Sequence, residues 1–167
     1  LLRDKRAIRA LASSLEYEQF RLGVAAQLAY LAHPRALEVL DEIRADDKAV
    51  PDEKARATIA LGHAGRADVA PALRELLADD RNNAFAAVAL AELHDESARP
   101  VLVKQLAIPS LRVQAARALR RLSAEANLIE LLPPLLAALD SNKDTEQVQV
   151  AEAILLLAGP SPWSERE

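Results

Sequence analysis

The 167-residue chain contains no cysteine and no methionine, and it has only four glycines. Without cysteine it can form neither a disulfide nor a thiolate metal site. Aromatic residues make up only 3% of the chain, although hydrophobic residues make up 51%. The apolar residues are therefore mostly alanine, leucine, valine and isoleucine. Because alanine is prominent and glycine is scarce, the composition favours helices over strands.

The chain also lacks a long apolar segment and a strong charge of either sign. No run of about 18 apolar residues is present, so the sequence predicts no membrane span. The formal net charge is −4 and the pI is about 5.5, which argues against non-specific binding of nucleic acid. The first residues, LLRDKR, show neither an initiator methionine nor a signal-peptide pattern. We therefore expect a trimmed N-terminus and a cytoplasmic protein.

A hairpin of two short helices recurs along the chain. In residues 56–80, RATIALGHAGRADVAPALRELLADD, a first amphipathic helix closes at Leu61 and a glycine-containing turn follows it. Asp68 then stands where an N-cap is expected, with Pro71 in the first turn of a second helix. Neither helix is long enough to be stable alone, so the hairpin requires neighbours.

The residue that closes the first helix returns at a regular spacing. The equivalent positions are Leu28, Leu61, Leu90, Leu119 and Ile154. Their steps of 33, 29, 29 and 35 residues lie within the range of helical solenoids. Three residues before each of them stands a small residue, which lets adjacent helices approach closely.

This spacing divides the chain into three parts. Residues 1–16 are interpreted as a basic N-terminal capping or truncated helix, and residues 17–158 as an array of about four to five helical hairpins. The predicted units span residues 17–47, 51–80, 81–108, 109–140 and 143–158. Residues 159–167 are rich in proline, serine and charge and are predicted to be a flexible tail.

Two segments carry a family resemblance, VQAARALRRL at 113–122 and ATIALGHAGRADVAPALRELL at 57–77. They resemble HEAT repeats, and especially the short bacterial repeats of the phycobilin-lyase type. The resemblance covers roughly residues 17–158 and implies an all-α superhelix, a HEAT-like solenoid. It also implies a non-catalytic scaffold or adaptor that binds a protein on a concave surface built by the second helices. The alternative that the repeat subtype implies is a lyase-like or chaperone-like accessory module that handles a prosthetic group or an enzyme partner.

No catalytic or metal-binding pattern is present in the sequence. His33, His63 and His94 take three different repeat positions, and none has a histidine or carboxylate at the helical i, i+4 spacing of a metal site. They are followed by proline, alanine and aspartate, so the repeated His-Glu pairs of deoxyhypusine hydroxylase are absent. Nucleophile-elbow, P-loop and dinucleotide-binding patterns are absent too. The sequence therefore predicts no enzyme activity, no metal and no cofactor.

A cluster of arginines stands out in the fourth first helix, at Arg112, Arg117, Arg120 and Arg121. One interpretation is a patch for a phosphate or an acidic partner, and the other is a solvated outer helix face. No aromatic residue interleaves with these arginines, as single-stranded nucleic acid would require. We therefore favour the solvated face.

A ridge along the second helices is our first candidate for partner binding. If these helices are in register, equivalent outward positions fall to Asp41, Glu42, Arg74, Glu75, Val103, Lys104 and Leu136. Along the array this ridge passes from acidic through mixed to apolar, which suits a protein or peptide partner. The alternative interpretation is that Val103 and Leu136 pack against the neighbouring second helix.

The last helix, VQVAEAILLL at 148–157, is our second candidate. It is apolar over more of its circumference than its counterparts, because Leu155 and Leu156 replace polar or small residues. A terminal repeat is expected to be polar on its outer face. We therefore predict an interaction surface centred on Leu155 and Leu156. This surface would be buried by the tail with Trp163, by a second copy of the chain in a homodimer, by a partner protein or by a further repeat.

Overall fold

A computed structural model describes residues 5–122, 131–139 and 144–158, and every regular element in these ranges is a helix. The α-helices are α1 (Lys5–Ser13), α2 (Glu18–Ala29), α3 (Pro34–Ala45), α4 (Pro51–His63), α5 (Ala70–Leu76), α6 (Asn83–Glu92), α7 (Arg99–Gln105), α8 (Pro109–Leu122), α9 (Leu132–Ala138) and α10 (Asp144–Ala158). Short 3-10 helices, η1 (Ser14–Glu16), η2 (Ala67–Val69) and η3 (Glu96–Ala98), precede α2, α5 and α7. The predicted fold class, an all-α array of helical hairpins, is confirmed.

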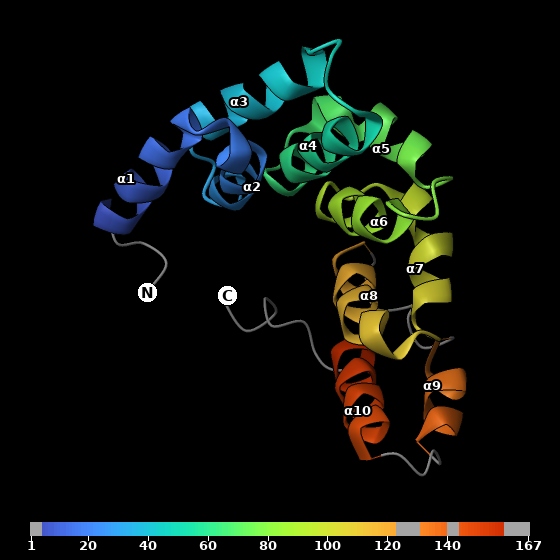
Figure 1. Ribbon diagram of the computed structural model, residues 1–167. Helices are drawn as coiled ribbons and strands as arrows, with labels where there is room; N and C mark the ends of the chain where they lie inside the picture. The colour runs from blue at the N-terminus through green and yellow to red at the C-terminus, as the bar shows by residue number, and fades with distance from the viewer. Residues whose placement is uncertain (1–4, 123–130, 140–143, 159–167) are drawn as a thin grey trace, which may run out of the picture.

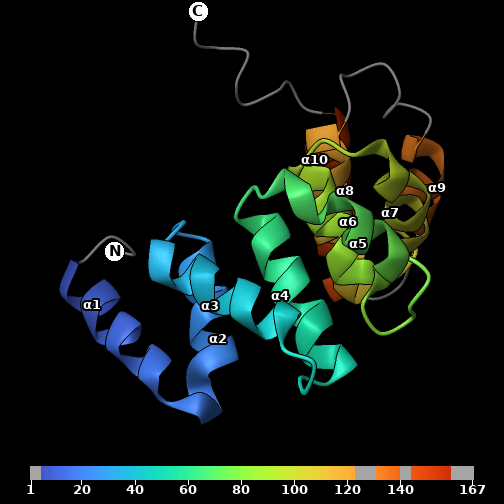
Figure 2. The ribbon, with the colours of Figure 1, turned by 90° about the horizontal axis from the view of Figure 1, so that it is seen from above.

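The helices form two layers that follow one arch (Figure 1). Helices α2, α4, α6, α8 and α10 line the inner side, and α3, α5, α7 and α9 form the outer side. Seen from above, the chain advances from α1 at one end to α9 and α10 at the other (Figure 2). Packing is mainly between successive helices and between successive inner helices. This nearest-neighbour packing is typical of solenoids.

The prediction that the second helices build the concave surface is wrong. In each hairpin the first helix lies on the inner side of the arch and the second lies on the outer side (Figure 1). The inner helices pack directly on one another, α2 on α4, α4 on α6, α6 on α8 and α8 on α10. Their contact faces are rich in buried alanines, such as Ala57, Ala60, Ala86 and Ala116. Small side chains bring the inner helices close together, and the arch therefore closes towards them.

The core consists of aliphatic side chains at repeat positions. The repeat leucines Leu28, Leu61, Leu90 and Leu119 are fully buried, as the spacing predicts. The outer helices add one fully buried leucine each at Leu40, Leu73 and Leu102. The first three hairpins thus contribute the same pair of leucines to a core that is shared between neighbouring hairpins.

A 3-10 turn precedes the second helices α5 and α7, and the predicted N-cap at Asp68 is wrong. Asp68 lies inside η2, and its Oδ1 accepts a hydrogen bond from Arg66 Nε at 2.7 Å. In the next hairpin Asp95 precedes η3 and accepts the backbone N–H of Ser97 at 3.0 Å. The extra turn places the capping position before the 3-10 segment, because the first backbone N–H groups without a helical hydrogen-bond partner lie there.

Two further predictions concern the ends of the chain. The predicted tail, residues 159–167, lies outside the described residues, and so do residues 1–4 of the predicted N-terminal helix. Within the described ranges no helix combines the length and the apolar character needed to cross a membrane.

Candidate functional site

The aromatic side chains of the described residues all lie on the surface. Tyr17, Phe20, Tyr30 and Phe85 are 52–61% exposed, whereas the core is aliphatic. Phe20, Tyr30 and Phe85 line hollows formed by the inner helices. Exposed aromatic side chains that do not serve the core are typical of binding surfaces. They locate the candidate site on the inner face.

Three hollows follow one another along this face. The central hollow has a volume of about 360 Å³ and lies between α2, α4 and the start of α6. The N-terminal hollow, of about 640 Å³, lies between α1, α2 and α4. The polar hollow, of about 570 Å³, lies at the C-terminal ends of α2, α4, α6 and α8.

The hollows form one continuous surface because they share lining residues. Gln27 and Arg56 line both the N-terminal and the central hollow. Tyr30 and His63 line both the central and the polar hollow. We call this continuous surface the inner groove. It crosses four successive inner helices, from α2 to α8.

One residue from each of these helices builds a polar ladder along the groove, at Tyr30, His63, Glu92 and Arg121. Each is the second residue past the repeat leucine of its unit. The rings of Tyr30 and His63 stack with centroids 5.2 Å apart. His63 Nδ1 lies 2.7 Å from Glu92 Oε2, and Arg121 Nη1 donates to Glu92 Oε1 at 2.5 Å. The ladder therefore joins α2, α4, α6 and α8 through side chains.

Glu92 is the electrostatic centre of the ladder. Burial raises its pKa, but the hydrogen bonds and charges of His63 and Arg121 outweigh burial and hold the pKa below the ordinary value of 4.5. The pKa of Tyr30 is raised by burial and by the nearby charge of Glu92. At neutral pH the ladder thus holds an ionised carboxylate, which accepts hydrogen bonds from both His63 and Arg121. Its charges are matched to one another, as in a structural network.

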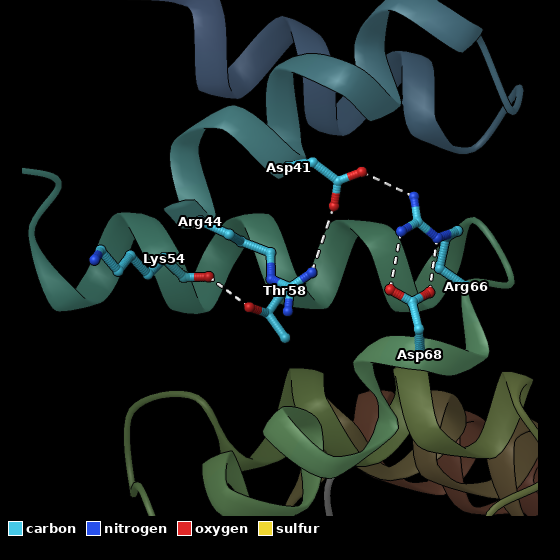
Figure 3. Close-up of polar contacts among 6 residues, drawn as sticks. All are labelled: Asp41, Arg44, Lys54, Thr58, Arg66 and Asp68. Atoms are coloured by element: carbon cyan, nitrogen blue, oxygen red, sulfur yellow. Dashed lines mark hydrogen bonds and ion pairs between the residues drawn. The ribbon is translucent and has the colours of Figure 1, made fainter. Parts of the chain in front are cut away.

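The predicted ridge lies on the outer side, and its acidic end is occupied by internal ion pairs. Asp41 Oδ2 accepts from Arg66 Nη1 at 2.9 Å, and Asp41 Oδ1 accepts from Arg44 Nη1 at 3.4 Å (Figure 3). Arg66 also forms a two-pronged pair with Asp68 (Figure 3), and both carboxylates raise its pKa. These pairs hold α3 against the turn between α4 and α5.

The remaining ridge residues do not form one surface either. Glu42 pairs with Arg21 and Arg35, and Arg74 pairs with Asp95 at 2.6 Å. Val103 is partly buried and packs against the core. The others, Glu75, Lys104 and Leu136, are exposed.

Leu155 and Leu156, on which the predicted C-terminal surface is centred, lie in different environments. Leu155 is 72% exposed, whereas Leu156 is half-buried against the core. Val148, seven residues before Leu155 and on the same helix face, is 67% exposed. The exposed apolar stripe on α10 therefore contains Val148 and Leu155 in place of Leu156.

The arginine cluster of α8 is neither a free patch nor a uniform solvated face. Arg112 is buried, and its Nε donates to the backbone carbonyl of Leu106 at 2.8 Å. Arg117 reaches Glu152 of α10 at 2.7 Å. Arg121 belongs to the polar ladder. The cluster thus ties α8 to its neighbours on both sides.

Sequence reasoning missed the ladder and the groove. The i, i+4 spacing reveals only partners within one helix, whereas His63 has its partners, Tyr30 and Glu92, in the neighbouring repeats. The available signal was register, because all four ladder residues take the same position relative to the repeat leucines. Among the described residues, no group of three or more histidine or acidic side chains could hold a metal ion.

The fold and the groove define an all-α helical-repeat protein with an open inner face. No protein-family model matches the chain, and no curated protein matches it. The resemblance to HEAT repeats therefore stays a prediction.

Proposed function

We propose that the chain is a non-catalytic scaffold or adaptor that binds a protein partner in the inner groove. The observation that supports this proposal is the exposure of Phe20, Tyr30 and Phe85 along the groove. Aromatic side chains supply much of the binding energy at protein interfaces because they bury a large area at a small entropic cost. A helical array holds them on a rigid support, so the loss of conformational entropy on binding is small.

The shape of the groove favours an extended or helical segment of the partner over a small molecule. The groove crosses four helices and is built from connected open hollows. A partner segment that follows it would contact several repeats in turn, as a solenoid surface allows. The accessory-module alternative rests on the repeat resemblance alone. A coloured or copurifying ligand in the isolated protein would support that alternative.

A second candidate surface is the stripe of Val148 and Leu155 on α10. Both side chains are strongly exposed, and they lie on the side of α10 opposite to the buried Val150, Ala153 and Leu157. A second copy of the chain could bury this stripe in a homodimer, since a two-fold interface places one stripe against its counterpart. This contact would leave the inner groove open for the partner.

Peptide selection followed by affinity measurements tests the groove. Peptides are selected from a random display library on the immobilised chain and then measured against variants. The double variant Tyr30→Ala/Phe85→Ala removes two aromatic side chains of the central hollow. Tyr17→Ala is the matched control, because Tyr17 is equally exposed and lines none of the three hollows.

The proposal predicts that selected peptides bind the double variant about tenfold or more weakly. Their affinity for the Tyr17→Ala variant should equal that for the unmodified chain. Peptides that bind all three proteins equally would contradict a partner site in the groove.

A further inference from the structure

We propose that the central hollow selects a partner segment in which a carboxylate lies beside an aromatic or aliphatic side chain. This inference rests on the proposed function, because it names what the inner groove recognises. The residues that carry it are Arg56 and Arg81, together with the apolar wall formed by Tyr30, Ile59 and Phe85.

The first step is the pairing of the arginines. Most described arginines donate to a carboxylate or a backbone carbonyl within the chain. Among the described residues, no hydrogen bond or ion pair engages the guanidinium groups of Arg9, Arg56 and Arg81. Two of these three line the central hollow. The charge of Arg81 acts on the nearby Asp79, whose pKa it helps to lower, but the two groups form no ion pair. The chain has more acidic than basic residues, so carboxylates are available to pair with most arginines. Two guanidiniums without an ion pair in one hollow therefore differ from the other arginines.

The second step is the charge of the hollow. Besides the two arginines, its lining contains one carboxylate, Asp52, so its formal charge is positive while that of the whole chain is −4. Asp52 lies in the first turn of α4, where the helix N-terminus already favours a negative charge. No ion pair joins Asp52 to either arginine in the described part of the chain. The guanidiniums therefore stay available for an external carboxylate, which a guanidinium binds in a two-pronged geometry.

The third step is the apolar wall. Three successive inner helices supply this wall. Tyr30 follows the end of α2, Ile59 belongs to α4, and Phe85 belongs to α6. A volume of about 360 Å³ lies near the lower end of the range of about 300–1,000 Å³ for ligand pockets. Such a space suits an aromatic or aliphatic side chain next to a carboxylate. A ligand with only a carboxylate would leave the apolar wall of the hollow exposed to water.

The surroundings favour a single carboxylate over a polyanion. The adjacent N-terminal hollow contains two carboxylates, Glu18 and Glu53, and one guanidinium, Arg56. A nucleic acid that followed the groove would bring its phosphates against these carboxylates and be repelled. A peptide can place one acidic residue at the arginines and neutral residues elsewhere.

The test uses a fluorescent peptide, Gly-Ser-Leu-Glu-Phe-Glu-Ser-Gly, and its counterpart with Gln in place of both Glu residues. Their affinities for the full chain are measured by fluorescence anisotropy. The charge variant is Arg56→Gln/Arg81→Gln, and the matched control is Arg9→Gln. Arg9 is also unpaired, but it lies on α1 outside the hollows. The double aromatic variant described above is measured in parallel.

We expect the Glu peptide to bind about tenfold more tightly than the Gln peptide, which corresponds to about 1.4 kcal/mol. The Arg56→Gln/Arg81→Gln variant should lose this preference, and Arg9→Gln should keep it. The preference should also weaken as the salt concentration rises. These results together would support carboxylate recognition at the central hollow.

Equal binding of both peptides, or no binding of the Glu peptide, would overturn the inference. Retention of the preference by the Arg56→Gln/Arg81→Gln variant would overturn it as well. Binding that appears only after removal of residues 159–167, which include Trp163 and Glu165, would also overturn it, because the occupant would then be the chain itself. In each case the proposed function would remain supported if the library-selected peptides still bound the unmodified chain and lost affinity for the double aromatic variant.

Discussion

Gly62 lies where α4 closely approaches α5 and α6. A Cβ atom added there would meet Leu73 Cδ1 of α5 at 2.8 Å and Ala89 Cβ of α6 at 2.9 Å. Ala89 is part of an adjacent helix and can move only if α6 moves. The glycine therefore serves helix packing, although it lies in a helix, where alanine is the better former.

The substitution Gly62→Ala should destabilise the protein by about 1–3 kcal/mol, because the added methyl group overpacks the contact. Urea denaturation measures this change. The control is Gly23→Ala in α2, where an added Cβ would meet nothing within 4 Å. That substitution should stabilise the protein by about 0.5–1 kcal/mol. A Gly62→Ala variant as stable as the Gly23→Ala variant would contradict this account.

Glu92 should make the free energy of unfolding of the array depend on pH in the acidic range. Because its pKa in the folded chain lies below the ordinary value of 4.5, ionised Glu92 stabilises the fold above that pH. The stabilisation is lost as the pH falls through the lower, folded-state pKa. At pH 7 the variant Glu92→Gln should therefore be less stable by about 1–2 kcal/mol.

Urea denaturation at a series of pH values tests this prediction. The difference between Glu92→Gln and the unmodified chain should shrink below pH 4.5 and disappear once Glu92 is protonated. The exposed Glu75, on the outer side, supplies the control Glu75→Gln, which should change stability by less than about 0.5 kcal/mol. A constant difference for Glu92→Gln from neutral to acid pH would refute the role of its charge.

The helices themselves were the most predictable level of this structure. The repeat leucines and small residues located the inner helices, because burial repeats at helical spacing within each hairpin. The starts of α5 and α7 were predicted less well, since a 3-10 turn precedes each of them and moves the cap. A sequence shows cap-forming residues but does not show which turn they close.

Helix α10 carries a prediction of its own. If its exposed stripe pairs with a second copy of the chain, Leu155→Glu should abolish concentration-dependent association in a light-scattering series. The stability of the fold should change by less than about 0.5 kcal/mol, because Leu155 is 72% exposed. Ile108→Glu is the matched control, since Ile108 is an exposed aliphatic residue between α7 and α8. Equal association of both variants and the unmodified chain would exclude α10 as the contact.

At the scale of the whole molecule, the direction of curvature could not be predicted from the sequence. Curvature depends on how closely successive hairpins approach in each layer, and no pattern within one hairpin contains that distance. The alanine-rich contacts between the inner helices set it. The binding surface that we propose is therefore the inner groove, whereas the sequence alone suggests the ridge of Asp41, Arg74 and Val103. No role could be assigned to Tyr30 and Phe85 from the sequence, because their exposure is visible only in the structure.

Methyl NMR of the chain with a selected peptide tests the central claim, binding in the inner groove, most directly. Ile59 and Val24 line the central and the N-terminal hollow, whereas Ile43 and Val103 lie on outer helices. A peptide bound in the groove should shift the methyl signals of Ile59 and Val24 and leave those of Ile43 and Val103 unchanged. Shifts confined to Ile43 and Val103 would place the partner on the outer ridge and contradict the account.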